Sequence, residues 1–116
     1  MYKYEIENIR VVDGDTIDCD IDLGFGVWLS RQRVRLARID APETRTKDLE
    51  EKERGLETKA RVDEWLKFAS HLYLQSYSHR ERGKFGRILG DVFRDQEDES
   101  LSDYLLRHGL VKRYGE

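Results

Sequence analysis

The sequence contains few residues that crosslink or interrupt a chain. Cys19 is the only cysteine among 116 residues, which excludes an internal disulfide and a zinc site made of several thiolates. No apolar run is long enough to cross a membrane. The first residues, MYKYEIENIRVVDGD, are charged and lack the apolar segment of a secretory signal peptide. We therefore expect an intracellular, cytoplasmic protein that has no association with a membrane.

The composition predicts one globular domain, residues 1–116. Hydrophobic residues make up 38% of the chain and charged residues 39%, a balance typical of folded soluble proteins rather than disordered ones. The length suffices for one hydrophobic core but not for two. No repeat or linker divides the chain, and nothing in the sequence requires more than a monomer.

Charge distribution is more informative than net charge. The net charge of -3 argues against a general nucleic-acid coat protein, because such proteins bind by neutralising phosphates. Acidic residues are concentrated in KDLEEKE and RDQEDES, which we expect to be solvated surface. The basic residues form two groups: Arg31, Arg33, Arg35 and Arg38, and then Arg80, Arg82, Lys84 and Arg87. This segregation of charge allows one positive face.

Hydrophobic periodicity predicts five strands. The clearest is GDTIDCDIDLG, in which apolar side chains alternate with aspartates and the glycines that follow mark a turn. Pro42 ends the third strand, because proline has no amide hydrogen for the ladder. The strands are expected at residues 3–12, at 14–24, in a third stretch through about Ile39, at 71–78 and at 86–94.

Two helices complete the pattern. Residues 44–54 have no apolar face and are predicted to be a mobile surface loop. A helix follows at residues 55–69, where apolar side chains fall on one stripe. Ser100 is expected to cap a short second helix that Gly109 ends. Three strands, a helix, two strands and a helix indicate a mainly β protein with helices (α+β), built on a five-stranded OB-fold barrel.

Three carboxylates are expected at positions where burial of their charge would be unfavourable without a cation or hydrogen bonds. Asp15 has the same strand parity as Ile17 and the apolar residues that follow, so its side chain should point inward at the start of the second strand. Asp40 and Glu43 follow the third strand. Carboxylates gathered at one rim of the barrel suit Ca²⁺ or Mg²⁺, with water and a backbone carbonyl completing the shell.

Two arginines supply matching positive charge. Arg35 belongs to the third strand and Arg87 opens the fifth, and a guanidinium fork binds the oxygens of a phosphodiester as charge accumulates during hydrolysis. Arg35 and Asp40 would lie on opposite faces of a straight strand, so their convergence requires a bulge or bend near residues 37–39. On spacing alone, structural salt bridges remain the simpler explanation of these arginines.

Four motifs resemble those of the staphylococcal nuclease (thermonuclease) family. They are VDGDTI, VRLARIDAPE, KFGRILG and LLRHGLVK, in this order and at suitable separations from about Val11 to Lys112. The resemblance implies the OB barrel that the order of elements also predicts. It further implies an endonuclease that needs one Ca²⁺ ion, cuts DNA and RNA at the 5′ P–O bond and leaves 3′-phosphates.

The resemblance also implies a role for each matching residue. The implied roles are calcium binding by Asp15, Asp40 and the main-chain carbonyl of Ala41; binding of the scissile phosphate by Arg35 and Arg87; activation or positioning of the attacking water by Glu43; and substrate contact by Lys84, Phe85 and Tyr114. Phe85 replaces the tyrosine of the best-known members, so a hydroxyl near the phosphates is lost. Tyr114 stands where it can replace their nucleotide-contacting tyrosine. Single-stranded nucleic acid is the expected substrate.

The main alternative is a family member that has lost catalysis and only binds nucleic acid or a protein partner. The complete catalytic set favours the enzyme. A different nuclease could use Glu50 and Lys52 as an E-x-K element, but these residues lie in a charged stretch and not on a buried strand. His71, His79 and His108 lack the paired spacing of a zinc or general-base site.

Overall fold

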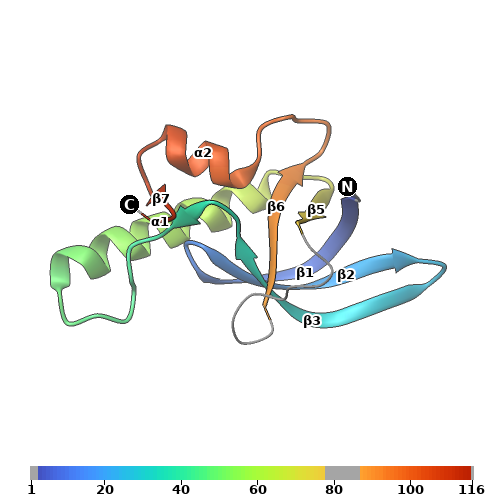
Figure 1. Ribbon diagram of the computed structural model, residues 1–116, viewed down its shortest axis with the longest axis horizontal. Coiled ribbons are helices and arrows are strands. Elements are labelled where there is room, and N and C mark those ends of the chain that lie inside the picture. Colours follow the sequence, from blue (N-terminus) through green and yellow to red (C-terminus); the bar gives the residue numbers. More distant parts are fainter. Residues whose placement is uncertain (1–2, 78–86, 116) are drawn as a thin grey trace.

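Five strands close into a barrel at the centre of the molecule (Figure 1). The computed structural model describes residues 3–77 and 87–115. The barrel strands are β1 (Lys3–Asp13), β2 (Thr16–Gly24), β3 (Val27–Leu36), β5 (Leu72–Ser76) and β6 (Ile88–Arg94). They pair in the order β1-β2-β3-β6-β5, and all pairs are antiparallel except β3 with β6. This confirms the predicted mainly β fold and the OB-type barrel.

Two further strand pieces form a separate pair beside the barrel. They are β4 (Ile39–Asp40) and β7 (Lys112–Arg113), which run antiparallel. The predicted third strand through Ile39 is therefore wrong in one respect: β3 ends at Leu36, and the chain bends before it enters β4. That bend brings the residues after it back beside the barrel end.

The strand β2 shows why alternation predicted the barrel correctly. Ile17, Cys19 and Ile21 are all at most 3% exposed, whereas Asp18 and Asp20 between them are partly exposed. Burial, followed by the charges of Asp20 and Asp18, raises the pKa of the Cys19 thiol to about 12. The thiol therefore stays protonated and packs as a small apolar group.

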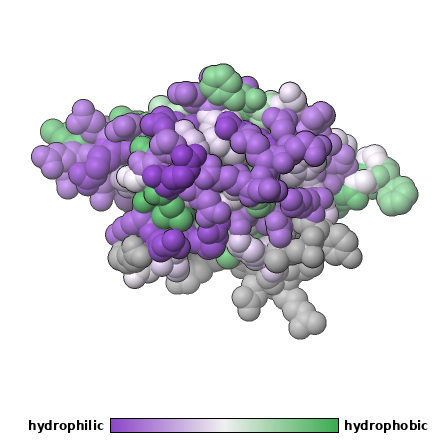
Figure 2. All heavy atoms as spheres, turned by 90° about the horizontal axis from the view of Figure 1, so that it is seen from above, coloured by the Kyte–Doolittle hydropathy of each residue, from purple (hydrophilic) through white to green (hydrophobic). Residues whose placement is uncertain are grey.

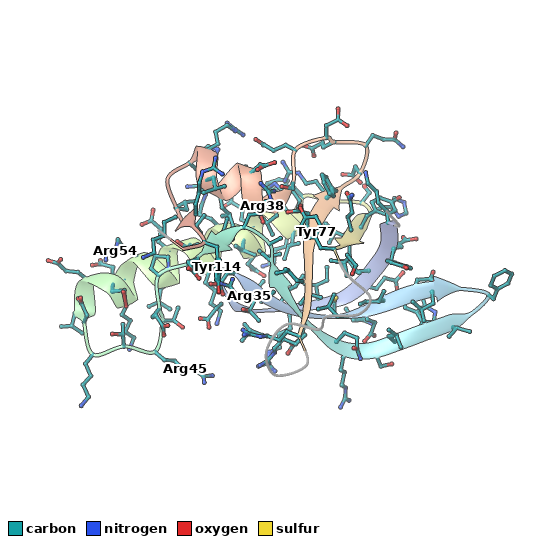
Figure 3. All side chains as sticks on the ribbon, viewed as in Figure 1. Arg35, Arg38, Arg45, Arg54, Tyr77 and Tyr114 are labelled. Atoms are coloured by element: carbon teal, nitrogen blue, oxygen red, sulfur yellow. The ribbon has the colours of Figure 1, made fainter. Side chains whose placement is uncertain are left out.

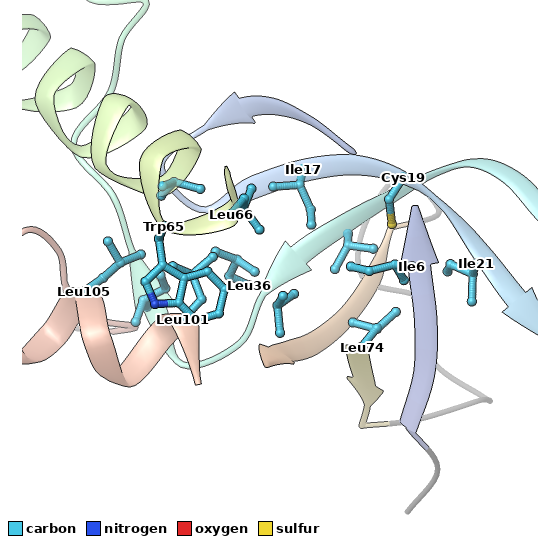
Figure 4. Close-up of a cluster of buried hydrophobic side chains, with 14 residues drawn as sticks. Ile6, Ile17, Cys19, Ile21, Leu36, Trp65, Leu66, Leu74, Leu101 and Leu105 are labelled. Atoms are coloured by element: carbon cyan, nitrogen blue, oxygen red, sulfur yellow. The ribbon is translucent and has the colours of Figure 1, made fainter. Parts of the chain in front are cut away.

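The core fills the barrel and continues between the barrel and the helices (Figure 4). Burial of each large aliphatic side chain contributes about 1.5–3 kcal/mol to folding. The buried cluster consists of Ile6, Ile17, Cys19, Ile21, Val34, Leu36, Ile39, Val62, Trp65, Leu66, Leu74, Val92, Leu101 and Leu105. Residues from the barrel and from both helices share this one cluster, so the helices are fixed against the end of the barrel.

The helix α1 (Leu49–Lys67) begins earlier than the sequence predicted. The prediction of a loop at residues 44–54 is wrong from Leu49 onward. The Asp48 carboxylate accepts hydrogen bonds from the amides of Glu50 (3.1 Å) and Glu51 (3.3 Å), and both glutamates favour a helix N-terminus. The first turns project beyond the barrel (Figure 1), so they need no apolar face.

The helix α2 (Leu101–Arg107) has the predicted limits. The Ser100 hydroxyl accepts a hydrogen bond from the amide of Asp103 at 3.1 Å, and Leu101 and Leu105 are fully buried. Gly109 follows with a φ of 67°, a conformation that glycine adopts at little cost. Hydrophilic residues dominate the face seen in Figure 2. No helix in the described part of the chain has the length and apolarity needed to cross a membrane.

Candidate functional site

The bend between β3 and β4 brings Arg35 and Asp40 together. Arg38 has a φ of 71°, so the chain turns sharply there instead of continuing as a strand. The Ala37 amide donates to the Gly90 carbonyl at 2.9 Å, which ties the bend to β6. As a result, Nη2 of Arg35 lies 2.6 Å from Oδ1 of Asp40. The bend that the sequence required near residues 37–39 is present.

Asp15 reaches the same guanidinium from the turn between β1 and β2. Its Oδ2 lies 3.1 Å from Nη1 of Arg35, and their side chains are 17% and 15% exposed. The amide of Ala41 donates to Oδ2 at 3.0 Å, and the hydroxyl of Thr16 donates to Oδ1 at 2.9 Å. Asp15 thus lies at the partly buried end of the barrel, where a cation and a hydrogen-bond network balance its charge.

Two glycines allow the chain to pack closely around this site. A Cβ on Gly14 would lie 2.6 Å from Cγ2 of Thr58 and 2.9 Å from Cβ of Ala41. A Cβ on Gly55 would lie 2.7 Å from the carbonyl oxygen of Glu43. Because each of these distances is shorter than a carbon contact tolerates, α1 can approach the Asp15 turn and the segment after β4 only through these glycines.

Arg35, Arg87 and Tyr114 line one pocket of about 430 Å³. The guanidinium of Arg35 lies 5.9 Å from the centre of the Tyr114 ring, and Figure 3 shows the two side chains close together beside β4. The remaining lining comes from Leu36, Arg38, Ile39 and Leu89. An apolar floor flanked by arginine side chains and a phenol ring can accept a planar ring that carries a phosphate. The predicted contacts Lys84 and Phe85 lie outside the described residues.

Glu43 lines a neighbouring pocket instead. This second pocket, of about 700 Å³, lies between α1 and the segment that follows α2, and it shares Asp40 with the site around Arg35. Glu43 is exposed, and among the described residues its carboxylate has no hydrogen-bond or ion-pair partner. The structure therefore places Glu43 in the same pocket lining as Asp40 but outside the lining of the pocket that contains Arg35 and Arg87.

The donor set is compatible with a hard cation, although it is small. Asp15 and Asp40 both contact the guanidinium of Arg35, so two carboxylates, which are oxygen ligands of the kind that a hard cation takes, face one positive charge. Within residues 3–77 and 87–115, no group of three or more His, Cys, Asp or Glu side chains is placed to hold a metal. Water and phosphate oxygens would therefore have to complete the coordination shell of any ion held there.

The first basic group of the sequence is largely paired and does not form one free positive face. Arg33 lies 2.9 Å from Asp18, and this hydrogen bond lowers the pKa of the Asp18 carboxyl. Arg38 binds Asp91 and Asp103. Most of the second group lies outside the described residues.

The sequence identifies Arg38 only as a member of this basic group and does not predict its contacts with Asp91 and Asp103. One feature of the sequence points to these contacts: a large charged residue stands where a bend is required, although glycine would adopt such a conformation with less strain.

The other predicted alternatives find no support in the geometry. Glu50 and Lys52 are exposed in the first turns of α1, far from a buried strand. His71 is exposed and its Nδ1 lies 3.0 Å from Glu5. His108 is exposed at the C-terminus of α2, with its ring centre 4.5 Å from that of Tyr104. His79 lies outside the described residues.

The fold and the site define a small OB-fold protein with an arginine-lined pocket at the end of its barrel. The family model of staphylococcal nuclease homologues matches residues 33–115, and the chain belongs to this family. The matched region includes Arg35, Asp40, Glu43 and Arg87, whereas Asp15 precedes it. A search among curated proteins found no match.

Proposed function

We propose that the protein is a calcium-dependent endonuclease that hydrolyses phosphodiester bonds of DNA and RNA, cleaving the 5′ P–O bond and leaving 3′-phosphates. One observation carries the proposal. Arg35 belongs to β3 and Arg87 directly precedes β6, yet both line the same pocket, and Arg35 also contacts both aspartates expected to bind the metal. Membership of the staphylococcal nuclease homologues supports a nuclease-related or OB-fold binding function at the level of the family.

Arg35 and Arg87 would bind the scissile phosphate. During hydrolysis, negative charge accumulates on the equatorial phosphoryl oxygens, and two fixed guanidinium groups stabilise this charge more than that of the ground state. Arg35 is only 15% exposed, and two carboxylates hold its orientation, so little reorganisation is needed when the substrate binds. In this proposal, preorganisation of the arginines is the main source of catalysis.

Asp15, Asp40 and the main-chain carbonyl of Ala41 would hold one Ca²⁺ ion. When bound, Ca²⁺ supplies charge stabilisation at the phosphoryl oxygens and favours deprotonation of a nearby water. The Asp15 carboxylate already has a fixed orientation, because the amide of Ala41 and the hydroxyl of Thr16 both donate to it. The exposed Glu43 carboxylate, which lines the same pocket as Asp40, would accept a proton from the attacking water or orient that water.

Tyr114 would contact the nucleotide. This residue is 72% exposed and borders the apolar floor formed by Leu36 and Leu89, where a base can stack. A base that remains paired in a duplex cannot present its face to such a pocket. Single-stranded DNA or RNA is therefore the preferred substrate in this proposal.

A binding module without catalytic activity is the second candidate. One observation favours it: Asp15 and Asp40 already balance the charge of Arg35, while Glu43 lines a different pocket. In that case the pocket would bind nucleic acid without cutting it.

Strand cleavage separates the two candidates. Purified protein is incubated with single-stranded DNA and with RNA, in Ca²⁺ or in EGTA, and the products are resolved by length and by end group. The nuclease proposal predicts shortening that requires Ca²⁺ and leaves 3′-phosphates. Binding without shortening under all conditions would support the module. Arg107→Gln is a matched control, because Arg107 pairs with Glu99 on the surface, away from the pocket.

A further inference from the structure

Arg38 occupies a backbone conformation that favours glycine. Its φ of 71° lies in the left-handed region, where a side chain with a Cβ is strained. It stands at the centre of the bend, with Arg35 on one side and Asp40 on the other. A large charged residue at such a position indicates that contacts of its side chain compensate for the strain.

The guanidinium of Arg38 joins three parts of the fold. It donates to Asp91 of β6 at 3.0 Å, to Asp103 of α2 at 2.8 Å and to the hydroxyl of Ser100 at 3.2 Å. Asp91 is 5% exposed, and it also accepts a hydrogen bond from the hydroxyl of Tyr77. Figure 3 shows Arg38 and Tyr77 beside the upper part of β6, with Arg35 lower in the view.

The backbone of the bend is tied at several further points. The Tyr114 amide donates to the Arg38 carbonyl at 2.9 Å, and the Leu36 amide donates to the Asp15 carbonyl at 2.8 Å. In addition, Asp40 pairs with Lys112 in the small sheet. Movement of the bend would therefore displace Asp40 relative to Arg35 and would also displace Tyr114.

The contacts of Arg38 argue against a direct role in phosphate binding. The residue contributes to the lining of the pocket, but the two carboxylates that it pairs with belong to β6 and α2. Unlike Asp15 and Asp40, which pair with Arg35, these two carboxylates are not expected to bind the metal, so the proposed site leaves the guanidinium of Arg38 paired. Both arms of the guanidinium fork are engaged in these contacts. A phosphate approaching Arg38 would meet Asp103, whose side chain is 50% exposed.

We propose that Arg38 is a positioning residue: by binding Asp91 and Asp103 it holds the bend that places Arg35 and Asp40 in one site, without itself touching the substrate. The kinetic part of this inference rests on the proposed nuclease function. The structural part does not, since it concerns only the shape of the bend.

The kinetic test compares Arg38→Gly, Arg38→Lys and Asp103→Asn with the control Arg107→Gln, measuring kcat and KM on single-stranded DNA in Ca²⁺. Because small displacements of catalytic groups are costly, Arg38→Gly and Asp103→Asn should lower kcat by about 10- to 100-fold and change KM by less than about twofold. Arg38→Lys should recover part of the loss. The double variant Arg38→Gly/Asp103→Asn should match Arg38→Gly, because both changes remove the same contact.

The opposite pattern would overturn the inference. If Arg38 binds substrate directly, Arg38→Gly raises KM, whereas Asp103→Asn frees the guanidinium and lowers KM. Unchanged kcat in both single variants would also end the proposal.

A second measurement needs no activity. Amide hydrogen exchange at Ala41 and Tyr114 reports on two of the hydrogen bonds that hold the bend, with the β1–β2 ladder as internal reference. Arg38→Gly should lower protection at both amides by about tenfold or more while the ladder is unchanged. If the parent protein does not cut nucleic acid, the proposed function fails, and this exchange alone decides the structural part. Unchanged protection at both amides would refute it.

Discussion

Arg35 and Arg38 are three residues apart in the sequence, yet their guanidinium groups face different parts of the molecule. Both side chains line the arginine pocket, but Arg35 contacts two aspartates that belong to the candidate site. Arg38 contacts Asp91 and Asp103, which belong to the framework formed by β6 and α2. The difference shows that a cluster of arginines in a sequence need not act as one surface, because the bend pairs its members with carboxylates from different parts of the fold.

The largest effect is expected from removing Arg35 or Arg87, the two arginines that are proposed to bind the scissile phosphate. Arg35→Ala or Arg87→Ala should reduce the rate of DNA cleavage by about 1,000-fold or more, since each removes a group that stabilises charge in the transition state. Single-turnover cleavage of a labelled oligonucleotide measures the effect. Arg107→Gln should cut at the parental rate, and a cleavage rate within about tenfold of the parent for either alanine variant would refute its assigned role.

A substitution of Asp91 tests the contacts of Arg38, and its effect is measured on the free energy of unfolding rather than on the cleavage rate. Asp91→Asn should lower the free energy of unfolding by about 2–3 kcal/mol, because it weakens a buried contact to Arg38 and a hydrogen bond from Tyr77. Urea denaturation measures this change. The matched control is Asp18→Asn on the hairpin, where the Arg33 side chain is 48% exposed and the loss should stay below about 1 kcal/mol. Equal losses for the two variants would show that burial does not distinguish the pairs.

Glu43 provides a further test, because it neither lines the pocket that contains Arg35 and Arg87 nor contacts Arg38. Glu43→Gln should slow cleavage by about 100-fold while leaving the Kd for DNA within about twofold of the parent, because it removes a proton acceptor without removing a phosphate contact. Fluorescence anisotropy in EGTA gives the Kd. Cleavage at the parental rate would show that another group orients or deprotonates the water.

The pH dependence of stability gives the smallest expected effect. The hydrogen bond from Arg38 lowers the pKa of the Asp103 carboxyl in the folded state. A lowered folded pKa contributes stability that is present above the unfolded pKa and is lost as the pH falls, here below about 4. Asp103→Asn should therefore reduce the acid dependence of Tm while lowering Tm slightly at neutral pH. A Tm profile between pH 2 and 6 with the parental slope would contradict the contact.

Local patterns were sufficient for most of the fold. Alternation in β2 identified Ile17 and Ile21 as core, and the Ser100 cap identified the start of α2, because each depends on residues close in sequence. The start of α1 was missed because a capping aspartate and exposed glutamates stabilise a helix that projects into solvent and so has no apolar stripe there. The need for a bend near residues 37–39 followed from strand parity, but the network that holds it did not.

The sequence by itself determined the barrel, its order of strands and helices, and the residues available for a phosphate site, because side-chain periodicity and turn chemistry are local properties. Tertiary structure decided which charges meet. Asp15 reaches Arg35 across 20 residues, and Asp103 reaches Arg38 across 65. Closure of the barrel and the packing of α2 against β6 bring such partners within a few ångströms, and no local pattern encodes that pairing.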